Sequence, residues 1–263
     1  MLERSVRRSI IWSMMLVLSV TLAAAGCSNK AITSIDPLEG KVFAVPSGTV
    51  ADQLVLSRLP KAKFKYFPSA LDACMAVKRG EADAAAYDQP ILRNIAAKNQ
   101  GLVVLAEMIT VDDYGFAVAL DNQQLKTTID QVVAALKTDG TYDKLLKSWL
   151  PDKGAPVETE PLQLPGANGT LKFGTAAITE PFSFLDANGN IVGFDIDLAN
   201  YVAQKLGMRI QVVNMDFGQL IPAVAAGEVD MIGACITITQ ERAKTVLFSA
   251  PYYQGGIAAL VRG

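Results

Sequence analysis

Apolar and polar positions follow two different patterns along this chain, and the two patterns alternate from about residue 40 onward. Short apolar runs, some interrupted by a polar residue at every second position, are typical of strands. Longer stretches with apolar residues three and four positions apart are typical of amphipathic helices. The regular exchange of the two patterns predicts an α/β fold.

The predicted elements cover most of the chain after residue 40. Strands are expected at 42–45, 63–67, 81–87, 102–107, 114–119, 171–175, 209–213 and 229–236. Helices are expected at 50–59, 70–79, 91–98, 125–137, 141–149, 194–206 and 219–226. Between the two groups, residues 151–169 hold four prolines, three glycines and few aliphatic residues, which predicts a linker.

The stretch 227–253 contains the most informative turn of the chain. The nearly unbroken apolar run 229–236 suits a strand that is buried on both faces. Thr239 is placed to cap a helix that begins at Gln240. Arg242 then lies in the first helical turn, where a cation opposes the helix dipole at a cost of about 0.3–1 kcal/mol.

An arginine in that position is favourable if it holds an anion, to which the free N–H groups of the helix start also donate. The turn therefore predicts a site for a carboxylate. The alternative is a solvated arginine on a surface helix.

A short internal repeat suggests two similar βαβ lobes. The sequence Gly-Glu-Ala-Asp at 80–83 returns as Gly-Glu-Val-Asp at 227–230, each time after an amphipathic helix and before a predicted buried strand. Counted equally from the two glycines, Asp88 corresponds to Cys235. The alternative is that the two sequences are similar by chance, because a helix, a glycine and a strand often follow one another in common supersecondary units.

In open α/β sheets, ligands bind beyond the carboxyl ends of the strands. These ends are 46–49 and 87–88 in the first half and 175–179 and 234–237 in the second. If the halves face each other across these ends, Asp88 opposes Arg242, and the two charges suit a zwitterion. The alternative for Asp88 is a turn or helix cap before Pro90.

The composition of the chain argues against several classes of function. The chain has 263 residues, which is long enough for two hydrophobic cores. Its net charge is −2, so it has no excess of basic residues for binding nucleic acid. It has no histidine, the commonest general base and metal ligand, and its three cysteines form no CxxC pair. We expect no metal, no cofactor and no nucleic-acid partner.

The first 26 residues have the form of a signal peptide. Three arginines precede the apolar run 10–25, which is short for a spanning helix of about 20 residues. The small residues before Cys27 resemble a bacterial lipobox, with Ala24 where leucine is usual, and predict lipidation of Cys27 and a tether at 27–39. The alternatives are an uncleaved anchor and simple secretion.

The motifs of the C-terminal third resemble the bacterial extracellular solute-binding proteins of family 3, the polar amino-acid receptors of ABC transporters. The resemblance rests on Ala234, the run Thr-Ile-Thr at 237–239, Glu241-Arg242, and the run Ser-Ala-Pro-Tyr-Tyr at 249–253. It implies that Arg242 binds a ligand carboxylate, with Thr237 and the backbone of Ala234 and Cys235 around it. Cys235 stands where the family usually has glycine or serine.

Other segments resemble the family's later half, although they come first here. They are 40–42, 47–49, Asp88 with Pro90, 114–118 and 139–142. The resemblance therefore implies a two-lobed periplasmic-binding-protein-like (type II) fold with a strand hinge, in circularly permuted order. A misassembled or partial gene is the alternative.

The implied domains follow from that order. They are a small α/β lobe at 40–114, a hinge strand at 115–119, large-lobe helices at 120–150, a linker at 151–170, a large α/β lobe at 171–254 and a second hinge strand at 255–263.

By position in the family, Asp88 holds the ligand ammonium, Ser47 and Thr49 assist with the carboxylate, and Phe217 stacks on the ligand. Plain core packing is the alternative for Phe217. Two positions depart from the family, because Ala176 replaces a frequent acid and Thr179 replaces a frequent aromatic residue. Either Asp88 carries the ammonium with backbone help, or Glu180 reaches in, or the ligand is not a standard α-amino acid.

These features predict a monomeric, extracytoplasmic lipoprotein that captures an amino acid or similar zwitterion for an ABC importer permease. One alternative is a ligand-sensing module for a signalling partner. Another is a dehydratase-like enzyme on the same fold, for which Glu180 is the uncommitted acid.

Overall fold

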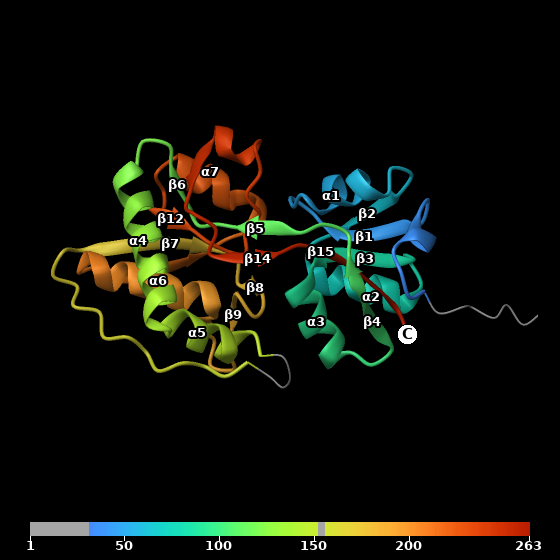
Figure 1. Ribbon diagram of the computed structural model, residues 1–263, viewed down its shortest axis with the longest axis horizontal. Coiled ribbons are helices and arrows are strands. Elements are labelled where there is room, and N and C mark those ends of the chain that lie inside the picture. The colour runs from blue at the N-terminus through green and yellow to red at the C-terminus, as the bar shows by residue number, and fades with distance from the viewer. Residues whose placement is uncertain (1–31, 152–155) are drawn as a thin grey trace, which may run out of the picture. The chain divides into compact units, whose positions relative to one another are not determined.

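The computed structural model describes residues 32–151 and 156–263, which form two α/β lobes joined by a two-stranded ribbon (Figure 1). The predicted α/β class is therefore confirmed. The predicted signal peptide and residues 27–31 of the predicted tether, Cys27 among them, lie outside the described residues. No helix in the described ranges has the length and apolar character needed to cross a membrane.

The first lobe is a five-stranded sheet in the order β2-β1-β3-β15-β4. Its strands are β1 (Val42–Pro46), β2 (Lys63–Phe67), β3 (Ala84–Asp88), β4 (Leu102–Met108) and β15 (Ile257–Arg262). Its helices are α1 (Ala51–Arg58), α2 (Ala70–Arg79) and α3 (Gln89–Lys98), after a 3-10 turn at Asp36–Leu38. β1 runs parallel to β2 and β3, whereas β15 runs antiparallel to both of its neighbours.

The second lobe is a five-stranded sheet in the order β11-β7-β12-β6-β13. Its strands are β6 (Ala117–Ala119), β7 (Thr170–Thr175), β11 (Arg209–Asn214), β12 (Met231–Ile232) and β13 (Val246–Phe248). Its helices are α4 (Gln123–Asp139), α5 (Thr141–Trp149), α6 (Phe194–Leu206) and α7 (Leu220–Ala225), with 3-10 turns at Phe217–Gln219 and Arg242–Lys244. A small antiparallel sheet adds β8 (Ile178–Thr179), β9 (Ser183–Leu185) and β10 (Ile191–Val192).

The internal repeat has the same geometry in both lobes. The Asp83 carboxylate accepts the Val42 N–H at 2.9 Å, and the Asp83 N–H donates to the Val42 carbonyl at 2.9 Å. Asp230 makes the same two bonds with Lys172, at 2.7 and 2.9 Å. The glycine that opens each repeat has a φ of 81° or 73°, in the region that glycine adopts without steric strain. Each repeat thus ends a helix and starts the next strand beside the first strand of its lobe.

The expectations around Arg242 are partly wrong. The strand expected at 229–236 is only Met231–Ile232, and later in the same run the backbone leaves the extended conformation at Cys235, which has a φ of 48°. The helix expected from Gln240 is only the 3-10 turn 242–244. The segment that follows forms β13, which pairs with β6 from a distant part of the sequence. A long-range strand pairing has overridden a local helix signal.

The ribbon between the lobes also differs from the expected hinge. β5 (Asp112–Tyr114) pairs antiparallel with β14 (Tyr253–Gly255), and Figure 1 shows both strands running between the two sheets. Residues 117–119 lie inside the second sheet, and β15 lies between β3 and β4 rather than along 115–119. Five successive residues of β15, from Ile257 to Val261, are buried. A strand that is apolar on both faces is accommodated in the middle of a sheet, between covered faces.

Because β15 fills the middle of the first sheet, its side chains are expected to contribute strongly to stability. Leu260 is fully buried, and we expect Leu260→Ala to lower the free energy of unfolding by about 2–5 kcal/mol through lost burial and a residual cavity. Urea unfolding measures the change. The control is Leu71→Ala on α2 of the same lobe, where the side chain is 49% exposed and the expected change is within about 0.5 kcal/mol. Equal losses in the two variants would contradict the central position of β15.

Candidate functional site

A small cavity lies where the first lobe meets the second. The first lobe supplies Thr49, Val50, Ala51, Tyr87, Asp88 and Ile257, and the second supplies Phe217, Cys235, Thr237 and Arg242. The fold therefore gathers six of the residues that the sequence singled out, and places Asp88 and Arg242 on the same cavity from different lobes. Its volume is about 10 Å³, and an adjoining cavity of about 70 Å³ shares Phe217 and Arg242.

Arg242 is held in position from three sides. Its backbone N–H donates to the Thr239 hydroxyl at 3.2 Å, although the helix that Thr239 was expected to cap does not form. Nη1 of the guanidinium donates to the Thr237 carbonyl at 3.0 Å, and the guanidinium carbon lies 5.5 Å from the centre of the Phe217 ring. Among the described residues no carboxylate forms an ion pair with Arg242.

The guanidinium of Arg242 therefore keeps most of its donors for another acceptor. A guanidinium has five N–H donors, and the fold uses one of them here. Burial lowers the pKa of Arg242 from its usual value, and the nearby Tyr87 and Asp88 oppose that shift. A desolvated cation without a counter-ion is an arrangement that favours binding of an anion.

Asp88 is the last residue of β3 and its side chain is buried. The Tyr114 hydroxyl donates to Oδ1 of Asp88 and accepts the Gly256 N–H at 3.2 Å. Desolvation raises the pKa of Asp88 to about 7, although the bond from Tyr114 and the charge of Arg242 act in the opposite direction. Asp88 occupies the N-cap position of α3, as the alternative interpretation held, but its side chain makes no capping hydrogen bond.

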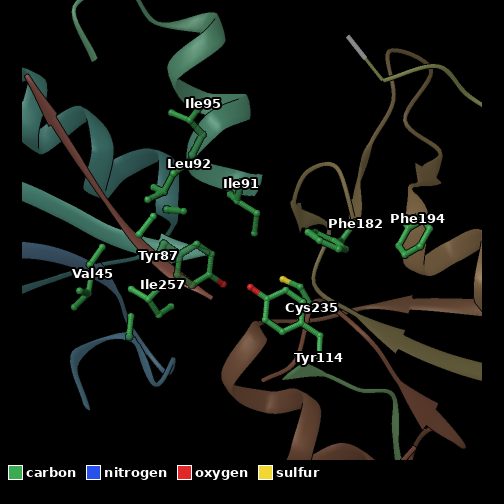
Figure 2. Packing of buried hydrophobic residues seen from close by; sticks show 14 of the residues in the cluster. Val45, Tyr87, Ile91, Leu92, Ile95, Tyr114, Phe182, Phe194, Cys235 and Ile257 are labelled. Atoms are coloured by element: carbon green, nitrogen blue, oxygen red, sulfur yellow. The ribbon is translucent and has the colours of Figure 1, made fainter. Parts of the chain in front are cut away.

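Tyr87 lines the cavity and Tyr114 contacts the lining residue Asp88, and sequence reasoning gave neither tyrosine a role in the site. Both are buried, and burial raises the pKa of each hydroxyl well above its usual value. In Figure 2 the two hydroxyls point toward one another, with Cys235 beside Tyr114. The only available signals were that Tyr87 directly precedes Asp88 and that Tyr114 opens a predicted strand.

Cys235 adopts a backbone conformation that is uncommon for residues with a side chain. Its N–H donates to Oδ2 of Asp195 at 2.9 Å, which ties the turn to the first turn of α6. Burial raises the pKa of the Cys235 thiol well above its usual value. Burial also raises the pKa of Asp195 to about 7, against the effect of the Cys235 N–H.

Several predicted residues have their polar groups engaged elsewhere. Thr49 lines the cavity, but its hydroxyl donates to the Pro46 carbonyl at 2.9 Å. Ser47 is exposed, Ala234 is fully buried, and neither is part of the lining. The Thr179 hydroxyl is buried and lies 3.2 Å from two backbone carbonyls, those of residues 176 and 183.

Glu180 does not line the cavity. Its two carboxylate oxygens accept from Nζ of Lys98 at 2.6 and 2.7 Å. Lys98 is the last residue of α3 in the first lobe, so this ion pair joins the two lobes outside the cavity.

The sequence of the C-terminal third matches known proteins. Residues 171–263 match the model of the bacterial extracellular solute-binding proteins, family 3. A putative ABC transporter arginine-binding protein 2 of Escherichia coli K12 is 42% identical over 84 residues, 32% of this chain and 35% of that protein. The arginine-binding extracellular protein ArtP of Bacillus subtilis 168 is 45% identical over 83 residues, 32% of each chain.

A solved structure gives a match of similar extent. The arginine-bound form of domain 1 from TmArgBP is 45% identical and covers 35% of this chain and 79% of that domain, with a TM-score of 0.32. This chain spans about a third of the length of the curated relatives that it matches.

The buried carboxyl of Asp195 predicts a pH-dependent stability. Its pKa is raised from 3.8 to about 7 in the folded state, so the folded protein binds the proton more tightly than the unfolded chain. The resulting stabilisation is complete below pH 3.8 and is lost as pH rises through about 7. Between pH 8 and pH 5 we expect Asp195 to add about 2–3 kcal/mol to the free energy of unfolding.

Urea unfolding at pH 5 and pH 8 measures this difference. Asp195→Asn keeps an oxygen that can accept the Cys235 N–H but has no titrating proton, so its stability should rise less as the pH is lowered. If the variant and the unaltered protein show the same difference between the two pH values, Asp195 does not titrate in this range.

Proposed function

We propose that this chain, whose residues 171–263 match the model of the bacterial extracellular solute-binding proteins, family 3, is a receptor that captures an amino acid or a similar small zwitterion between its lobes. The observation that carries the proposal is the placement of Arg242 and Asp88 on one cavity from opposite lobes. The ligand carboxylate binds the free donors of Arg242. The ligand ammonium binds Asp88, and its charge favours the ionised carboxylate, whose pKa is otherwise raised.

Binding requires the lobes to separate first. Pockets for small molecules usually measure about 300–1,000 Å³, far more than the two cavities of about 10 and 70 Å³. Two short strands, β5 and β14, connect the lobes at this point. We assign the opening to this ribbon, since a hinge of a few strand residues can absorb the rotation between rigid lobes. The ligand then joins Arg242 to Asp88 and favours the closed arrangement.

The same proposal includes the partners. The relatives named above are binding proteins, and one of them is described as part of an ABC transporter, so delivery to the permease of an ABC importer is the role that we infer for a monomeric, extracytoplasmic protein. An enzyme on this fold would need an acid free to act on the ligand. Glu180, the candidate for that role, is bound by Lys98.

We also propose that the order of the lobes is permuted. β15 follows the second lobe in sequence but lies in the first sheet, in the order β1-β3-β15. Phe43 is paired with Ala84, and Leu260 with Ala85, so the end of β15 and the start of β1 lie at the same edge of the sheet, two strands apart. Two strand spacings are about 10 Å, which a short loop can span. Such a loop, with a cut between α5 and β7, restores the order that the family resemblance implies.

The carboxylate role of Arg242 is tested by substitution. We expect Arg242→Ala to weaken binding of an amino-acid ligand by about 2–5 kcal/mol, because one partner of a desolvated charge pair is lost. Isothermal titration calorimetry against a panel of amino acids measures the change. Arg79→Ala is the control, since Arg79 pairs with Glu81 on the surface of the first lobe. An unchanged dissociation constant for Arg242→Ala rules out the carboxylate site.

Membrane anchoring depends on Cys27, which lies outside the described residues. We propose that it carries the lipid anchor, and we expect Cys27→Ala to move the protein from the membrane fraction to the soluble fraction. Cys74→Ala is the matched control, because Cys74 is a buried cysteine of the folded first lobe. Mass spectrometry of the Cys27 peptide checks for the lipid. A peptide without added mass, together with unchanged fractionation, would contradict this assignment.

A further inference from the structure

The charges that line the two cavities balance. Among the lining residues, Asp88 is the acid and Arg242 is the base, so the ionised lining has no net charge. Tyr87 and Cys235 also line the cavity, but burial holds both in the neutral form by raising their pKa values well above the usual range. The remaining lining groups are apolar side chains, glycines and two threonines.

The other acids nearby are engaged outside the lining. Both oxygens of Glu180 accept from Lys98, and Asp195 lies behind Cys235 and accepts its N–H. Asp112 raises the pKa of Asp88 by repulsion, but it belongs to the ribbon and accepts the hydroxyl of Thr110. Within the described residues, no second carboxylate lines either cavity.

We propose that the ligand is a zwitterion whose side chain carries no charge, an inference that rests on the proposed amino-acid-binding function. Once the ligand carboxylate has bound Arg242 and its ammonium has bound Asp88, no charged group of the described lining remains to pair with the ligand side chain. A cationic side chain would then be buried without a counter-ion, and an anionic one without a second base. Either arrangement is strongly unfavourable in a desolvated cavity. The specificity therefore differs from that named for the arginine-binding relatives, although residues 171–263 are similar to them.

Titration of the full chain with L-glutamine and with L-arginine separates the two possibilities, because the ligands have similar length and differ in side-chain charge. We expect L-arginine to bind roughly 100-fold more weakly than L-glutamine, or not at all. L-arginine binding as tightly as L-glutamine overturns the inference and leaves the proposed function intact. If no member of a full amino-acid panel binds, the proposed function fails and the inference fails with it.

A pair of variants at Thr49 tests the charge argument directly. Thr49 lines the cavity, and its hydroxyl accepts the Ala51 N–H at 3.3 Å, a bond that either aspartate or asparagine can supply. Thr49→Asp adds one negative charge to the lining, and Thr49→Asn has nearly the same shape without the charge. Any loss of affinity from the change of shape is shared by the two variants.

We expect the ratio of L-arginine to L-glutamine affinity to be at least roughly tenfold higher in Thr49→Asp than in Thr49→Asn. Circular dichroism establishes that both variants are folded before titration. Equal ratios in two folded variants would show that the charge of the lining does not determine which side chain is accepted, and would overturn the inference.

Discussion

The hydroxyl of Tyr114 is the contact on which the arrangement of the two lobes depends. Tyr114 lies on the ribbon, donates to Asp88 of the first lobe, and accepts the N–H of Gly256 at the start of β15. Its ring packs edge-on against Phe182 of the second lobe at a centroid distance of 5.9 Å. One buried side chain therefore holds the end of β3, the last strand and the second lobe together. Because its partner is the carboxyl that we assign to the ligand ammonium, hinge and binding site share a hydrogen bond.

The two lobes reach their ligand-facing edges through the same local chemistry. In each, an aspartate carboxylate accepts a backbone N–H from the neighbouring parallel strand, β1 in the first lobe and β7 in the second. This bond fixes where the next parallel strand begins. The residue five positions beyond the first of these aspartates is Asp88, and the residue five positions beyond the second is Cys235. The corresponding strand therefore ends at the acid Asp88 in one lobe and is followed by a sharp backbone turn at Cys235 in the other. Thr237 and Arg242 follow that turn in the sequence. The two repeats share this aspartate clamp but differ at the strand end, where Asp88 in the first lobe corresponds to Cys235 in the second.

Local signals in the sequence predicted most of the helices, but not the outcome after Gln240, where only a 3-10 turn forms. Ser69 caps α2 and Gly80 ends it in the left-handed conformation, as the residue types predict. Asp88 and Arg242 meet on one cavity because strand ends in parallel sheets gather at one edge. What escaped prediction depends on pairing between distant segments. Neither the insertion of β15 between β3 and β4, nor the recruitment of 246–248 into β13, nor the contact of Tyr114 with Asp88 has a nearby sequence signal.

The position of β15 also has a consequence for the order in which the chain is made. β3 and β4 are neighbours in sequence but not in the sheet, because β15 separates them, and 148 residues lie between Met108 at the end of β4 and Ile257 at the start of β15. The first lobe is synthesised early yet lacks one of its interior strands until the second lobe has been made. Completing a sheet with so distant a segment is slow, because a large loop must close before the new contacts form. Partly synthesised chains therefore carry an open, apolar strand edge, and unpaired strand edges of that kind favour aggregation.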